Sequence, residues 1–130
     1  MSTTDKQSQL EENKALAQKF HFNIIQKMDL DLADEIIAAD CEFHSPLSKT
    51  NQLKGPERAK SSARRDKEIY PNGVSFVHDN IVAEGNLVAF HWISSGVKAN
   101  GEVGGGEGID IVRIENGKIA ETWIQFNLGS

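Results

Sequence analysis

The spacing of apolar residues changes once along this chain, and the change divides it into two structural halves. Before Gly73, apolar side chains such as Leu16, Phe20 and Ile24 recur every three or four residues, which is the period of one helix face. After Gly73 they alternate with polar residues, which is the period of a strand. Helices followed by strands predict an α+β domain whose antiparallel sheet carries the helices on one face.

The first half predicts three helices and one short strand. The second helix begins after Asp29 or Asp31, either of which could cap it, and Pro56 stands in the first turn of the third helix. The polar N-terminus lacks this periodicity, so we expect residues 1–8 to be disordered and residues 9–130 to form a single domain. The expected helices cover residues 9–28, 32–39 and 55–69, with the strand at 41–45.

The second half predicts four strands in a meander. Turn residues at 84–86 and 115–117 form two of the three connections between these strands. The third contains the glycine-rich stretch at residues 101–106, which we interpret as a flexible loop. It precedes a strand and not a helix, so it lacks the helix N-terminus of a phosphate-binding loop. The expected strands cover residues 74–83, 87–98, 108–114 and 118–127.

Length and charge exclude several classes of protein. A chain of 130 residues with 38% hydrophobic content suits one soluble domain, and its net charge of -5 without a basic stripe argues against nucleic-acid binding. Cys41 is the only cysteine, so no intrachain disulfide or cysteine-rich zinc site can form. No signal peptide or membrane span is apparent, and the four histidines show no metal-ligand spacing. We expect a cytoplasmic protein without a metal or cofactor.

Four stretches occur in an order and spacing that resemble the SnoaL-like proteins of the nuclear transport factor 2-like superfamily. The first stretch covers the expected second helix and the strand after it. The second stretch begins the third helix, and the last two have the alternating pattern of paired strands. They are DLDLADEIIAADCEFHSP at residues 29–46, GPERAK at 55–60, NIVAEGNLVAFHW at 80–92 and GIDIVRIENGKIAETW at 108–123.

This resemblance implies a cystatin-like cone, in which a curved antiparallel sheet wraps around the N-terminal helices and encloses an apolar pocket. It also implies a homodimer packed through the sheets. The superfamily includes polyketide cyclases, ketosteroid isomerase and epoxide hydrolases, together with binding members that have no catalytic activity. The fold alone therefore does not decide between an enzyme and a binding protein.

One position departs from the family pattern. In the cyclases that this chain resembles, the catalytic acid/base is an aspartate directly after the tryptophan of the last strand. Here Ile124 follows Trp123, and an isoleucine side chain cannot exchange a proton. Any acid/base chemistry must therefore come from another residue.

Asp110 is the candidate catalytic carboxylate, because it lies within a strand that should be central in the sheet. A carboxylate in an apolar cavity suits general-base chemistry. Its direction depends on the turn near Gly117: a two-residue turn puts it on the face of Trp123, and a three-residue loop with a glycine bulge puts it on the face of Thr122 and Ile124. The resemblance favours the second arrangement, with Asp110 facing the pocket. The alternative is a structural carboxylate paired with a neighbouring donor.

His44 is the candidate partner of Asp110, since the family often has a histidine where the first strand ends at the cavity rim. Its imidazole could donate to a ligand carbonyl or exchange a proton near pH 7, and the alternative is a hydrogen bond at the rim or surface. The apolar core and the cavity wall share residues in this fold. The expected ligand contacts are Phe20, Ile24, Phe43, Trp92, Thr122, Ile124 and Phe126.

The sequence therefore predicts a SnoaL-like pocket protein for a small, mostly apolar carbonyl compound, with isomerase- or cyclase-type acid/base chemistry. The alternative is a non-catalytic ligand-binding or dimerisation module of the same fold. We expect a homodimer, because Ile109, Ile111 and Trp123 would otherwise expose an apolar patch on the outer face of the sheet.

Overall fold

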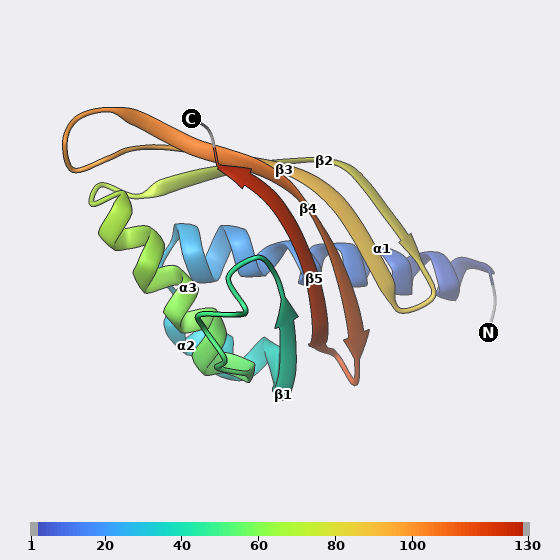
Figure 1. The fold of residues 1–130 in the computed structure, drawn as a ribbon. Helices are drawn as coiled ribbons and strands as arrows, with labels where there is room; N and C mark the ends of the chain where they lie inside the picture. Colours follow the sequence, from blue (N-terminus) through green and yellow to red (C-terminus); the bar gives the residue numbers. More distant parts are fainter. Residues whose placement is uncertain (1–2, 129–130) are drawn as a thin grey trace.

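The computed structural model describes residues 3–128 and has the expected order of helices and strands (Figure 1). The first helix continues without a break into a π-helical segment, η1. The elements are α1 (Thr3–Lys19), η1 (Phe20–Gln26), α2 (Leu30–Ile36), β1 (Ile37–His44), α3 (Gly55–Ile69), β2 (Val74–Glu84), β3 (Leu87–Val97), β4 (Val103–Glu115) and β5 (Lys118–Leu128).

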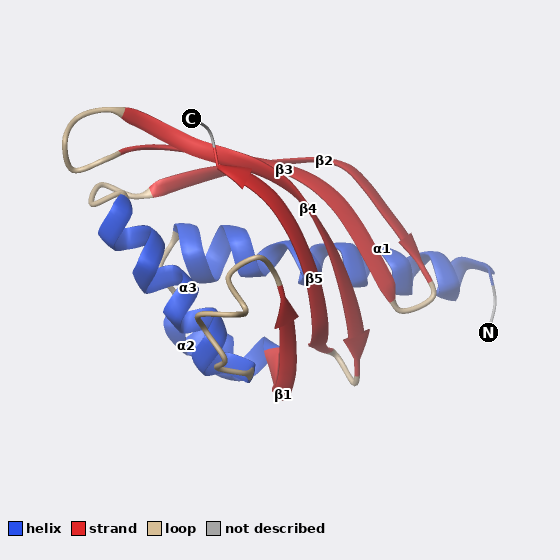
Figure 2. Cartoon of the chain, in the orientation of Figure 1, coloured by secondary structure: helices blue, strands red, loops and turns tan. Residues whose placement is uncertain are grey.

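The five strands form one curved sheet in the order β1-β5-β4-β3-β2. Strands β2 to β5 pair antiparallel, and β1 adds to β5 in parallel. Figure 2 shows that the helices lie together on one side, under the concave face of the sheet. The alternation of β3 explains this arrangement, because Val88, Phe90 and Trp92 point inward and are buried against the helices.

Several element boundaries differ from the sequence prediction, among them the end of the second helix, which lies at Ile36 and not at residue 39. The first helix begins at Thr3, so residues 3–8, expected to be disordered, are helical, while residues 1–2 lie outside the described part. Apolar periodicity could not reveal these turns, because the side chains of residues 4–8 are exposed. Strand β1 begins at Ile37, four residues earlier than expected, and an irregularity interrupts its pairing with β5 before Glu42.

The glycine-rich stretch is not a loop throughout, and this prediction was wrong. Residues 103–106 belong to β4 and pair with β3, so only residues 98–102 turn the chain. The glycines make room for an aromatic ring: a Cβ at Gly96 would lie 2.7 Å from Cδ1 of Tyr70, and one at Gly104 would lie 3.2 Å from the Tyr70 hydroxyl. A glycine run can thus mark close packing inside a sheet.

The β4–β5 hairpin combines a two-residue turn with a bulge, an arrangement that neither sequence alternative described. Asn116 and Gly117 both have positive φ, 54° and 73°, and the residues on either side of them pair. The register then shifts, because Arg113 pairs with Glu121 while Ile114 pairs with Ile119. The extra residue in β5 turns the following side chains over, so Asp110 faces Ile124.

Candidate active site

An apolar cavity of about 260 Å³ lies between the concave face of the sheet and the segments η1 and α3. Five of the seven expected ligand contacts line it: Phe20, Phe43, Trp92, Ile124 and Phe126. Ile24 and Thr122 are fully buried in the core and do not contribute to the cavity wall. The aromatic residues therefore form much of the surface that a ligand would touch.

Asp110 lies behind one wall of this cavity and is only 1% exposed. Its Oδ1 accepts a hydrogen bond from the indole Nε1 of Trp92 at 2.8 Å, and its Oδ2 lies 3.1 Å from Nε2 of His21. The rings of Trp92 and His21 line the cavity, whereas Asp110 does not. His21 is therefore the residue of this pair that would contact a ligand, and Asp110 fixes the position of its ring through Nε2.

His21 begins a chain of hydrogen bonds that leads away from the cavity. Its Nδ1 lies 2.8 Å from Nε2 of His78, and Nδ1 of His78 lies 3.2 Å from Oε1 of Gln18. Gln18 donates from Nε2 to the backbone carbonyl of Lys14 at 3.0 Å. Because that carbonyl only accepts, Gln18 presents its oxygen to His78, and His78 must donate from Nδ1.

This polarity fixes the ring protons. His78 accepts at Nε2, so His21 donates from Nδ1. The remaining nitrogen, Nε2 of His21, faces Oδ2 of Asp110 with one proton between them. The His21–Asp110 pair can hold or release that proton, and this is what an acid/base catalyst needs.

His78 is held in its neutral form. Burial, and to a smaller extent the nearby His21, lowers the pKa of His78 from 6.5 to about 4, while Asp110 and Asp79 act in the opposite direction. The ring of His78 packs 4.3 Å from that of Phe90, which accounts for its burial. A neutral His78 can accept a hydrogen bond from His21, as the chain of hydrogen bonds requires.

The depressed pKa of His78 makes stability depend on pH. Between pH 6.5 and about 4 the unfolded chain binds a proton at His78 that the folded chain does not bind, so the free energy of unfolding falls as the pH falls through this window. After allowance for partial exposure of the ring, we expect this residue to contribute a loss of about 1–2 kcal/mol. Urea unfolding at pH 7 and pH 4.5 measures the loss.

The matched variant is His78→Gln, whose side-chain oxygen can still accept from His21. It should lose about 1–2 kcal/mol less than the wild type over the same window, because the contributions of the carboxylates are common to both proteins. Equal losses in the two proteins would contradict the assignment of a neutral, half-buried His78.

The sequence analysis did not identify His21 or His78 as site residues. A signal for His78 was present, because it stands two residues after Phe76 in a strand and so shares its inward face. His21 follows Phe20 directly, and a regular helix would turn one of two adjacent side chains away from the cavity. The wider π-helical turns of η1 place both rings on the cavity wall.

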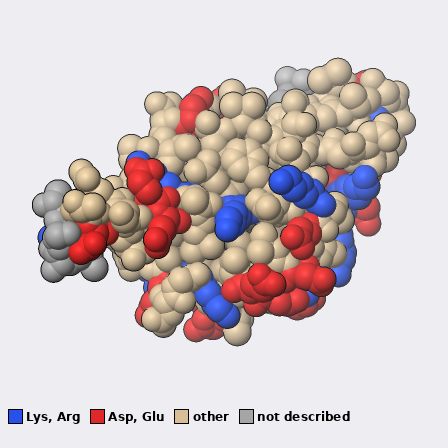
Figure 3. Space-filling view, turned by 180° about the vertical axis from the view of Figure 1, so that it is seen from behind, with Lys and Arg blue, Asp and Glu red and all other residues tan. Residues whose placement is uncertain are grey.

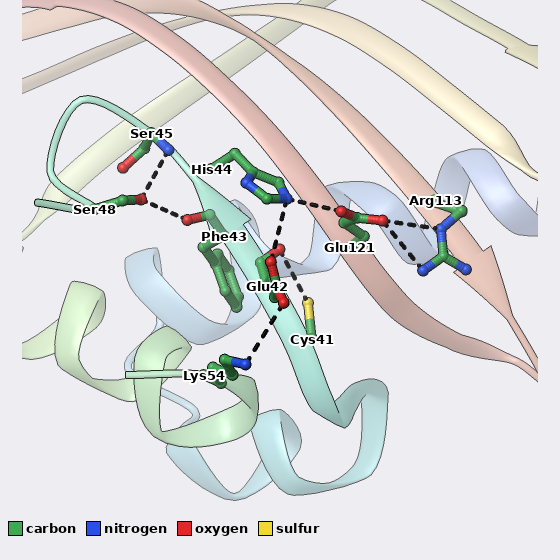
Figure 4. Close-up of polar contacts among 9 residues, drawn as sticks. All are labelled: Cys41, Glu42, Phe43, His44, Ser45, Ser48, Lys54, Arg113 and Glu121. Carbon is green, nitrogen blue, oxygen red and sulfur yellow. Dashed lines mark hydrogen bonds and ion pairs between the residues drawn. The ribbon is translucent and has the colours of Figure 1, made fainter. Parts of the chain in front are cut away.

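The structure does not bring His44 together with Asp110. Figure 4 shows Phe43 and His44 leaving β1 on opposite sides, and Phe43 is the one that lines the cavity. Nε2 of His44 lies 2.7 Å from Oε2 of Glu121. The imidazole also stacks on Trp123, with 5.5 Å between the ring centres. Its hydrogen bond is the main reason that the pKa of Glu121 lies below its usual value.

Glu42, His44 and Glu121 form a group whose ligand atoms lie within 4.8 Å of one another, close enough to hold a metal ion. These atoms already have cationic partners (Figure 4), because Arg113 lies 3.3 Å from Glu121 and Lys54 lies 3.5 Å from Glu42. Glu42, Arg113 and Glu121 also line a polar groove of about 480 Å³ beside them. Ion pairing accounts for this cluster, whereas the aromatic cavity has the features of a ligand site.

The curved sheet and the helices beneath it form an α+β domain, and a buried histidine–aspartate pair lies at the wall of its aromatic cavity. A family model for SnoaL-like polyketide cyclases matches residues 15–129. The chain belongs to this family. No curated protein matches it at the level of sequence. Among residues 3–128, no helix has the length and hydrophobicity needed to cross a membrane.

Solved structures agree with the fold. A loop-truncation variant of IdmH, a protein of Streptomyces antibioticus, is 20% identical and superposes with a TM-score of 0.73 over 89% of this chain and 92% of its own. An LEH-like epoxide hydrolase of M. tuberculosis is 17% identical, with a TM-score of 0.72 over 92% of this chain and 85% of that one. TerC, co-crystallised with polyporic acid, is 12% identical, with a TM-score of 0.70 over 89% and 92%.

Proposed function

We propose that this protein is a cofactor-free acid/base catalyst of the isomerase or cyclase type, acting on a small, mostly apolar carbonyl compound. The observation that carries the proposal is the His21–Asp110 pair, in which Nε2 and Oδ2 lie 3.1 Å apart at the wall of an aromatic cavity. The family supports a small-molecule substrate. The cavity volume of about 260 Å³ favours a ligand of one or two rings.

The chemistry needs only proton transfer. The pair donates its shared proton through His21 to the carbonyl oxygen, and in its base form it then takes a proton from the α-carbon. The electron pair of the broken C–H bond forms the carbon–carbon double bond of an enol. Where a further double bond is conjugated with the enol, the pair delivers this proton to a different carbon and takes back the proton of the enol oxygen, which gives the isomer, restores the pair and consumes no cofactor.

Exchange of α-protons with D₂O tests the proposal without knowledge of the natural substrate. We would follow α-tetralone and 1-indanone by proton NMR, with and without the protein. The wild type should accelerate loss of the α-proton signal over buffer. His91→Gln is the control, because His91 lies on the outer face of the sheet, bonded to Asp79 and Glu107. It should exchange as fast as the wild type.

The alternative is a non-catalytic binding module, and Ile124 favours it, because the position where similar cyclases have a catalytic aspartate is an apolar part of the cavity wall. Calorimetric binding of the same ketones without any acceleration of exchange would support this alternative and overturn the catalytic proposal.

We also propose that the protein is a homodimer, packed through the outer face of the sheet. Large apolar side chains on this face are exposed, among them Val77, Ile93, Ile109, Ile111 and Trp123. A patch that extends over four strands is typical of an interface. Light scattering at tens of micromolar should give twice the 14.3 kDa mass of the chain, and a monomer mass would contradict the proposal.

A further inference from the structure

Arg58 is a buried cation in the cavity wall. Its side chain rises from the first turn of α3, and the residue is only 4% exposed. One guanidinium nitrogen donates to the backbone carbonyl of Asn51 at 2.8 Å, and another donates to Oγ of Ser45 at 3.1 Å. The guanidinium carbon lies 5.6 Å from the centre of the Phe43 ring. Every one of these partners is electrically neutral.

The positive charge of Arg58 therefore has no counter-charge within residues 3–128, where it forms no ion pair. A buried charge is costly unless an opposite charge or a metal compensates it. Burial accordingly lowers the pKa of Arg58. The two hydrogen bonds use two of the five N–H donors of a guanidinium, so donors remain for a ligand.

The other charged groups of the cavity do not balance it. Arg65 and Lys98 also line the wall, and among the described residues Asp66 is the only carboxylate in the lining. Asp66 forms an ion pair with Arg65 at 3.6 Å, so it compensates that charge and not the charge of Arg58. Burial also raises the pKa of Asp66. The chain as a whole has a net charge of -5, and the face drawn in Figure 3 carries both acidic and basic side chains. The cavity lining thus carries an excess of positive charge, opposite in sign to the net charge of the chain.

We propose that the natural ligand is a carboxylate with an apolar ring body, its carboxyl group bound by Arg58 and its ring held among Phe43, Trp92 and Phe126. A planar guanidinium matches a carboxylate through two parallel hydrogen bonds. The inference rests on the proposed function for the identity of the site and narrows its substrate to an acidic carbonyl compound. Binding of the anion does not itself require catalysis.

The test compares 1-naphthoate with its neutral isostere 1-naphthamide by titration calorimetry. The wild type should bind the carboxylate at least tenfold more tightly than the amide. Arg58→Gln should remove this preference and leave amide binding within a factor of about three. Arg58→Lys, which keeps the charge without the planar fork, should retain part of the preference. Arg64→Gln is the control, because Arg64 is an exposed arginine of the same helix, and it should behave as the wild type.

Equal affinity of the wild type for the two compounds, or no binding of either at 1 mM, overturns the inference, even if the Arg58 variants do not fold. A carboxylate preference that survives in Arg58→Gln also overturns it. The two proposals fail separately. If the protein prefers the carboxylate but does not accelerate α-proton exchange, the catalytic proposal is wrong and the ligand class stands. If it accelerates exchange but has no carboxylate preference, the ligand class is wrong and the catalytic proposal stands.

Discussion

Asp110→Asn should slow α-proton exchange by about 10²–10⁴-fold, the usual contribution of a positioned acid or base. The reason is that an amide cannot share a proton with Nε2 of His21. The fold should persist, because asparagine fits the same hydrogen bonds: its oxygen accepts from Trp92, and its amide donates to Nε2 of His21, which the carboxylate oxygen faces at 3.1 Å. We expect the Tm to change by no more than a few degrees.

Nitrogen NMR of the His21 ring reports which ring nitrogens carry a proton. This pattern would not change if Asp110 had only a structural role. In the variant, Nε2 should carry no proton while Nδ1 still donates to His78. His91→Gln again serves as the control for the loss of an exposed polar group. An unchanged exchange rate in Asp110→Asn would show that the pair does not act in the reaction. A collapse of the Tm would instead show that Asp110 is needed for folding.

Gly105→Ala should have the largest effect on stability, a loss of about 4 kcal/mol and a fall in Tm of more than 10 °C. Gly105 has a φ of +142°, a conformation that side chains of L-residues rarely adopt. An added Cβ would lie 2.1 Å from the backbone carbonyl oxygen of Ser94 on the neighbouring strand. Backbone atoms of a paired strand cannot move aside without breaking the ladder between β3 and β4.

Gly101→Ala separates the two causes. Gly101 also has a positive φ, +88°, but nothing lies within 4 Å of the position of an added Cβ. It should cost only about 1 kcal/mol, the contribution of backbone conformation alone. Urea unfolding of both variants measures the difference, and equal losses would contradict the close approach of Gly105 to Ser94.

The sequence was sufficient for the fold because its information is periodic. The change of hydrophobic spacing near Gly73 predicted helices followed by strands, and the sheet has that organisation. The family pattern added the curved sheet, and aromatic residues such as Phe20 and Trp92 line the cavity beneath it. These features depend on many residues at once, so a single departure from the pattern does not obscure them.

The site was harder to predict because it depends on single-residue changes of direction. His21 reaches the cavity only through the wider turns of η1, and the inward direction of Asp110 depends on a bulge in the neighbouring strand. Neither irregularity has a clear sequence signal. His44 shows the opposite case. The family often has a histidine at this position, but here its side chain points to the outer side of β1. Local backbone geometry decided all three positions.

The bulge in β5 restricts how the length of this chain can change. Side chains alternate between the two faces of a strand, so removing one residue from 118–121 would exchange the inward and outward sets that follow it. Thr122, Ile124 and Phe126 would then face outward, and Trp123 and Gln125 would replace them beneath the sheet. Removing or adding two residues would preserve both sets. Chain length between Gly117 and Thr122 can therefore vary only in steps of two without reversing the lining of the cavity.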